Sequence, residues 1–110
     1  MADAFAWLKQ AEEDLQAARK SFADKDYDLA LQQSRNSAER ALQATWIVLT
    51  GEDPEEVHSV SKLARMVGLD DLLEEFEDAP PASDDPRKSM AMRSLQIAER
   101  VMAEVKPKFQ

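Results

Sequence analysis

The chain has 110 residues, of which 44% are hydrophobic and 33% charged, with a net charge of −8 and no cysteine. This length and composition fit one globular domain over residues 1–110. The negative charge argues against non-specific nucleic-acid binding by the whole surface, and the lack of cysteine excludes disulfides, a thiol nucleophile and a cysteine-ligated zinc site.

Turn-forming residues and long apolar runs are both scarce. Two glycines in the chain are too few for the frequent turns of an all-β protein. No segment approaches the ~18 apolar residues of a membrane span. Asp3 stands near the N-terminus, where an export signal carries basic residues. We therefore expect a cytoplasmic protein that makes no membrane contact.

Apolar residues recur at three- and four-residue steps over residues 3–22, which predicts a first amphipathic helix. Phe5 and Trp7 flank this stripe on opposite sides and are expected to widen the buried face. The stripe consists of Ala4, Leu8, Ala11, Leu15, Ala18 and Phe22.

A second helix is predicted over residues 27–50, with Asp26 as its N-cap and Gly51 as its stop. Its opposite side mixes apolar and polar residues, which predicts either a central helix or a dimer contact. The expected inward stripe is Tyr27, Leu31, Ser34, Ala38, Ala41, Leu42, Thr45 and Leu49, and the mixed side is Leu29, Asn36, Arg40, Gln43 and Ile47.

Two short helices, over residues 58–67 and 70–76, precede a proline-rich loop at 79–86 that excludes helix. A final helix is expected over 87–106. These elements predict an all-α fold, an antiparallel up-and-down bundle of four to five helices. The buried stripe of the final helix is Ala91, Ser94, Leu95, Ala98, Val101, Met102 and Val105.

Little conventional catalytic chemistry is available, because His58 is the only histidine. A nucleophile needs an adjacent base, and Ser59 and Ser61 point to different helix faces. A dinuclear carboxylate centre needs two Glu-x-x-His pairs, whereas Glu55 and His58 supply one. We expect no catalytic residue, no metal and no cofactor.

Three stretches in register resemble the HEPN domain family: residues 7–15 (WLKQAEEDL), 36–44 (NSAERALQA) and 58–63 (HSVSKL). The resemblance covers nearly the whole chain. It implies a four- or five-helix bundle, a homodimer and pairing with a separately encoded minimal nucleotidyltransferase. Many members of this family are RNA-cutting toxins.

The chain departs from the family pattern at its ribonuclease signature, an arginine followed after four to six residues by a histidine. Counting back from His58, the arginine positions hold Asp53, Glu52 and Gly51. The Arg-Tyr-Pro-Asp stretch of non-toxin relatives is also missing before the last helix, where residues 82–86 read ASDDP. The resemblance therefore implies a member without the family's nuclease chemistry.

The candidate contacts to a nucleotide or RNA are Arg35, Arg40, His58, Arg93 and Arg100. A solvated basic face is the alternative for Arg93 and Arg100, and capping or packing of the third helix is the alternative for His58. Asp14 and Glu39 are expected to be structural polar residues. For Asp14 we expect a hydrogen bond or an ion pair between helices.

These observations lead to the hypothesis of a non-catalytic homodimer that partners a nucleotidyltransferase-like protein in a toxin–antitoxin-type module and contacts a nucleotide or RNA. One alternative is a divergent metal-independent HEPN ribonuclease that uses the same arginines and His58. Another is a helical adaptor whose acidic segment 50–86, with twelve acidic and two basic residues, binds a basic protein.

Overall fold

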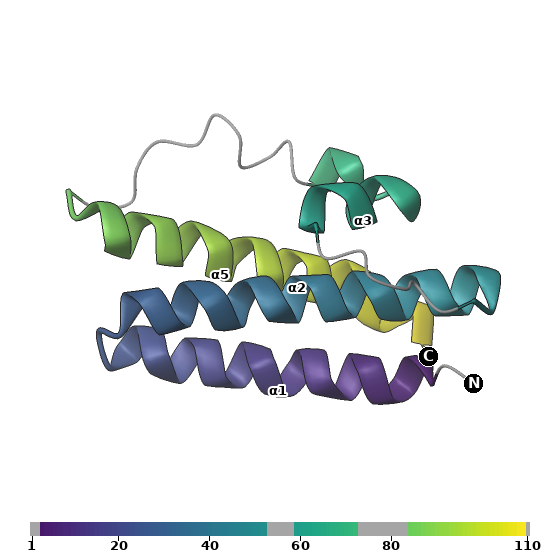
Figure 1. Ribbon diagram of the computed structural model, residues 1–110, viewed down its shortest axis with the longest axis horizontal. Coiled ribbons are helices and arrows are strands. Elements are labelled where there is room, and N and C mark those ends of the chain that lie inside the picture. Colours follow the sequence, from purple (N-terminus) through teal and green to yellow (C-terminus); the bar gives the residue numbers. More distant parts are fainter. Residues whose placement is uncertain (1–2, 53–58, 73–83, 110) are drawn as a thin grey trace.

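A computed structural model describes residues 3–52, 59–72 and 84–109. Helix α2 (Tyr27–Thr50) lies between α1 (Ala4–Ala23) and α5 (Pro86–Val105), with the short α3 (Val60–Met66) against α2 (Figure 1). Residues 70–72 are also helical, and a 3₁₀ turn, Lys106–Phe109, ends the described chain. The predicted all-α fold is confirmed, since the described residues include no strand.

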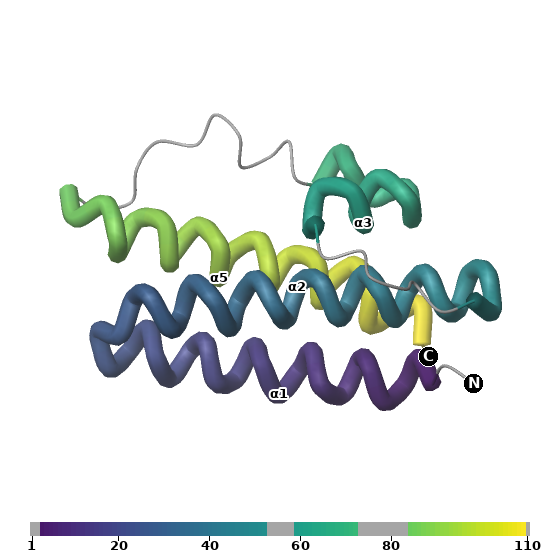
Figure 2. Tube along the Cα trace, viewed as in Figure 1, coloured from purple at the N-terminus to yellow at the C-terminus, as the bar shows by residue number. Residues whose placement is uncertain are grey.

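Helix α1 runs antiparallel to α2, whereas α5 runs in the same direction as α2 (Figure 2). Two contacts fix the parallel register of α2 and α5. Arg87 pairs with Asp28 at 3.7 Å near the start of both helices, and Ser34 Oγ donates to Ser94 Oγ at 2.6 Å farther along. Helix α5 therefore begins at the same end of the bundle as α2.

Short-range hydrogen bonds explain where the helices begin and end. The predicted cap Asp26 accepts from the backbone N–H of Leu29, and Gly51 closes α2 in the left-handed region at φ 73°. Ser59, and not His58, is the N-cap of α3, because its side chain accepts from the N–H of Lys62. Pro86 begins α5, where its missing N–H removes no helical bond.

Small residues fill the seam where α2 meets its neighbours, which lets the helices approach closely. The hydroxyl of Ser37 donates to the Ala11 carbonyl across the α1–α2 contact at 2.7 Å, and both residues are fully buried. Larger side chains from all the packed segments complete the core. The main cluster contains Ala11, Leu15, Ala38, Ala41, Leu42, Leu63, Ala64, Leu72, Ala98, Val101, Met102 and Val105.

Two residues predicted to be buried are exposed. Leu49 is 61% exposed, because the last turn of α2 extends past the ends of α1 and α5 (Figure 1). Phe5 is 65% exposed, and its ring meets the edge of Phe109 with the ring centres 5.4 Å apart. A stripe of apolar residues shows which way a helix faces, but not how far its neighbours reach.

The mixed side of α2 is partly buried within one chain. Gln43 is 2% exposed and Ile47 is 6% exposed, so Ile47 cannot serve as an exposed apolar contact of a dimer. The prediction of a central helix is confirmed for this part of α2. Among the described residues, no helix has the length and apolar character needed to cross a membrane.

Candidate functional site

Arg40 and Asp14 form an ion pair that joins α2 to α1. The Asp14 side chain is 16% exposed and the Arg40 side chain 37%, so the pair lies at the edge of the helix contact. Asp14 also accepts from Gln10 Nε2 at 3.2 Å, one turn earlier on α1. The carboxylate therefore holds both the guanidinium and the amide in place, as expected for a structural ion pair between helices.

Beside this pair lies a hollow of about 230 Å³, lined by Ala6, Trp7, Gln10 and Arg40. Its apolar lining comes from Ala6 and from Trp7, which is half-buried. Arg40, bound to Asp14, supplies the polar edge. The hollow is thus shallow and largely apolar, with one positioned guanidinium at its edge.

Arg35 lies elsewhere on α2, since five residues turn a helix by ~140° relative to Arg40. Its neighbour Ser34 is hydrogen-bonded to Ser94, the neighbour of Arg93, so Arg35 and Arg93 stand at the same level of the α2–α5 contact. Arg100 follows Arg93 after two turns of α5, ~10 Å farther along. The candidate arginines thus fall into two groups on different sides of α2.

Arg100 is partly neutralised by its own helix. Its guanidinium pairs with Glu104 at 2.5 Å, and both side chains are about 40% exposed. The two residues lie at one side of a groove of about 240 Å³ between α5 and the segment 68–72. Because exposed pairs contribute only ~0–1 kcal/mol, this pair adds little to the stability of the fold. The groove is lined by Gly68, Leu69, Asp71, Leu72, Arg100 and Glu104.

Some predicted residues cannot be placed in these groups. His58 lies outside the described residues, as does much of the acidic segment 50–86. Glu39 is half-buried on α2 and has interactions of its own. In the described part of the chain, no three acidic or histidine side chains come close enough to hold a metal ion.

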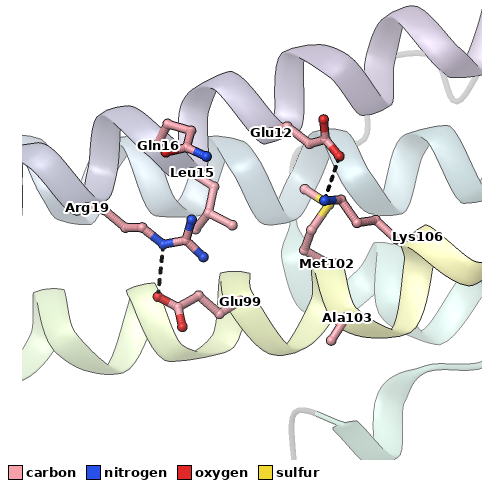
Figure 3. A pocket seen from close by; sticks show the side chains of 8 residues that line it. All are labelled: Glu12, Leu15, Gln16, Arg19, Glu99, Met102, Ala103 and Lys106. Carbon is pink, nitrogen blue, oxygen red and sulfur yellow. Dashed lines mark hydrogen bonds and ion pairs between the residues drawn. The ribbon is translucent and has the colours of Figure 1, made fainter.

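A further groove, of about 280 Å³, lies between α1 and α5 (Figure 3). Two ion pairs span it: Lys106 to Glu12 at 2.9 Å, and Arg19 to Glu99 at 3.4 Å. All four charged side chains are 41–51% exposed, so each pair contributes only ~0–1 kcal/mol. Leu15 and Met102 form its apolar floor, and Gln16 and Ala103 complete the lining.

The α1–α5 groove was not predicted from the sequence, although the sequence contains a charge pattern that indicates it. In both segments an acidic residue is followed after seven positions by a basic one: Glu12 and Arg19 on α1, and Glu99 on α5 with Lys106 in the 3₁₀ turn that directly follows it. Two such helices packed antiparallel bring opposite charges together at both ends. The complementary pattern could have predicted the pairing of α1 with α5.

Comparison with known proteins shows the family to which the chain belongs. The model of the HEPN domain family matches residues 4–80, which is more than half of the chain and includes α1, α2 and α3. Arg93 and Arg100, on α5, lie beyond the matched residues. No curated protein sequence shows significant similarity to the chain.

A solved structure extends the likeness to the whole fold. The chain superimposes on the crystal structure of ST0689, an archaeal HEPN homologue, with a TM-score of 0.69 and 24% sequence identity, and the match covers 100% of both chains. At 24% identity the structural match shows a shared fold. Membership of the family is shown by the match of the family model. The chain therefore belongs to the HEPN domain family.

Proposed function

We propose that this HEPN protein is a non-catalytic homodimer that binds a nucleotidyltransferase-like protein, as in a toxin–antitoxin-type module. The observation that carries the non-catalytic assignment is the spacing before its only histidine. Asp53, Glu52 and Gly51 occupy the positions where HEPN ribonucleases have an arginine. The pairing rests on family membership, since HEPN proteins commonly pair with nucleotidyltransferases.

Contact with a nucleotide or RNA is the second part of the proposal. Arginine binds phosphates through several N–H donors at once. Arg35 and Arg93 stand at one level of the α2–α5 contact, and Arg100 follows two turns later, which favours a phosphate-binding strip along this side. Arg40 is held by Asp14 on the other side of α2 and contributes to a separate surface.

Co-expression tests the partnership directly. We expect the tagged protein to retain the nucleotidyltransferase-like protein of the same genome through affinity purification and gel filtration, in a complex that contains two copies of this chain. An unrelated helical bundle carrying the same tag serves as the control. Separate elution of the two proteins at micromolar concentration would contradict the partnership.

We also expect the purified protein not to cleave RNA in the absence of metal. Cleavage by the ribose 2′-hydroxyl needs a base, an acid and positive charge near the phosphate. Around His58 the chain offers four carboxylates instead: Glu52, Asp53, Glu55 and Glu56. The measurement is gel analysis of a labelled single-stranded RNA.

The control for this test is His58→Ala. Cleavage by the parent protein that disappears in His58→Ala, while circular dichroism shows an unchanged helical fold, would support the ribonuclease alternative. Equal cleavage by both proteins would instead indicate a contaminating nuclease.

A further inference from the structure

The facing stretches 29–38 of α2 and 86–98 of α5 contain no acidic residue, in a chain whose net charge is −8. The two stretches lie side by side, because α2 and α5 run in parallel and Ser34 is hydrogen-bonded to Ser94 (Figure 1). Positive charge therefore gathers on one part of an acidic protein. The basic residues of the two stretches are Arg35, Arg87, Lys88 and Arg93.

Helix geometry places four arginines in one row along the α2–α5 contact. Arg35 follows Asp28 by seven residues, which is two turns with an angular offset of only ~20°. Because Arg87 pairs with Asp28 at 3.7 Å, Arg87 lies on the side of α2 that carries Arg35. Arg93 stands at the level of Arg35, and Arg100 follows Arg93 by seven residues on the same stripe of α5.

The row is too long for a single nucleotide. From Arg87 to Arg100 the rise along α5 is ~20 Å, and Arg93 divides it into steps of ~9 and ~10 Å. Phosphates along one strand of a nucleic acid follow each other every ~3.4 Å of helix axis, so ~20 Å corresponds to about six nucleotides. The phosphates of a mononucleotide lie together at one end of one sugar, so they cannot contact the whole row.

We propose that this row binds the sugar–phosphate backbone of a single-stranded nucleic acid, and not a mononucleotide. The inference rests on the proposed function, because it takes the contact with a nucleotide or RNA in that function and assigns the class of ligand. It also adds Arg87 to the residues that make this contact.

The ion pairs within the row leave donors for phosphates. A guanidinium has five N–H donors, so an arginine that pairs with one carboxylate keeps several others. Arg87 is paired in this way with Asp28, and Arg100 with Glu104, and these four side chains are 39–75% exposed. The row therefore has a net positive charge even when both pairs are intact.

The row offers phosphate contacts but little means of reading bases. Proteins that bind single strands hold the bases largely by stacking them on aromatic rings. Residues 29–38 and 86–98 contain no aromatic residue, and their strongly exposed large apolar side chains are Leu29 and Met90. Phosphates are common to RNA and DNA, which differ at the 2′-hydroxyl. We therefore expect binding to depend on strand length and salt, and not on base sequence or sugar.

Fluorescence anisotropy of labelled single strands tests the length dependence. We expect a strand of about ten nucleotides to bind at least about tenfold more tightly than a dinucleotide, equally for RNA and DNA. ATP at the same phosphate concentration should not displace the longer strand. A plot of log K against log salt should have a slope of about −1.4 to −2.8, because each phosphate contact on a single strand contributes ~−0.7 and two to four arginines take part.

Substitutions within the row test its position. Arg93→Gln, in the middle of the row, is expected to weaken binding of the longer strand at least about threefold and to make the salt slope shallower by ~0.7. Arg35→Gln, exposed on α2 at the same level, should have the same effect. Lys9→Gln makes the same change of charge at an exposed position of α1 and should alter neither quantity. Circular dichroism checks that each variant keeps its helical fold.

Four results would contradict the inference in different ways. Displacement by ATP, or equal affinity for the short and long strands, would overturn the backbone assignment and leave a nucleotide contact as in the proposed function. Equal displacement by a polyglutamate peptide of matched charge would indicate a site for acidic protein segments. A salt slope unchanged in both Arg93→Gln and Arg35→Gln would place the binding outside the row. Absence of binding to every strand and nucleotide would remove the nucleic-acid contact altogether, while the co-expression experiment reports on the protein partner independently.

Discussion

Leu42→Ala is expected to lower the free energy of unfolding by ~2–5 kcal/mol. Leu42 is fully buried in the middle of α2 and belongs to the cluster that also contains Leu15 and Leu63. Alanine would remove the apolar contacts and leave a cavity, because helices packed on several sides collapse only in part. Since small domains have a total stability of only ~5–15 kcal/mol, the change should be easily visible.

The matched control is Leu49→Ala, the same substitution seven residues later on the same helix. Leu49 is 61% exposed on the protruding last turn, so its truncation should change stability by less than ~0.5 kcal/mol. Urea denaturation followed by circular dichroism measures both variants. Equal losses for Leu42→Ala and Leu49→Ala would show that the last turn of α2 is buried against something that the single chain does not contain.

The sequence is sufficient to predict much of this fold because the signals are local. Asp26 and Gly51 mark the ends of α2, and both act as predicted: Asp26 accepts a first-turn N–H and Gly51 adopts the left-handed conformation. The buried stripe of α5 is likewise largely as expected, including Ala98, Val101 and Met102. Caps and helical spacing depend on neighbours within one or two turns, so a single sequence contains them.

Features that depend on the relative position of helices could not be predicted in the same way. The sequence suggests an interhelical ion pair for Asp14, but its partner, Arg40, is set by the register between α1 and α2. The parallel course of α5 beside α2 depends on the path of the long connection. Leu49 illustrates the same limit, since its burial depends on where α1 and α5 end.

The candidate site was predictable as a set of residues but not as an arrangement. Charge and spacing point to Arg35, Arg40, Arg93 and Arg100, and their role in binding a nucleotide or RNA stays a prediction. The structure separates Arg40, which is tied to Asp14, from Arg35 and Arg93 on the α2–α5 side. Contacts made by Arg40 and contacts made by Arg35 and Arg93 would therefore lie on different sides of α2.

The packing of α2 against its neighbours depends on the close approach of these helices. The substitution Ala41→Leu tests this dependence. Ala41 is fully buried on α2, one turn after Ser37, whose hydroxyl donates to the Ala11 carbonyl of α1 at 2.7 Å. A leucine at position 41 adds three carbon atoms where no space exists and pushes neighbouring helices apart. Overpacking typically costs ~1–3 kcal/mol, and the loss of the buried Ser37 hydrogen bond adds ~1 kcal/mol or more.

We therefore expect Ala41→Leu to lower the free energy of unfolding by at least ~2 kcal/mol. Ala103→Leu, the same enlargement at an exposed position in α5, should change it by less than ~0.5 kcal/mol. Urea denaturation gives the free energies, and near-ultraviolet circular dichroism of Trp7 and Trp46 reports whether the native packing is kept. An Ala41→Leu variant as stable as the parent would mean that α2 has room to spare at its centre, and the small residues at positions 34, 37, 38 and 41 would then need another explanation.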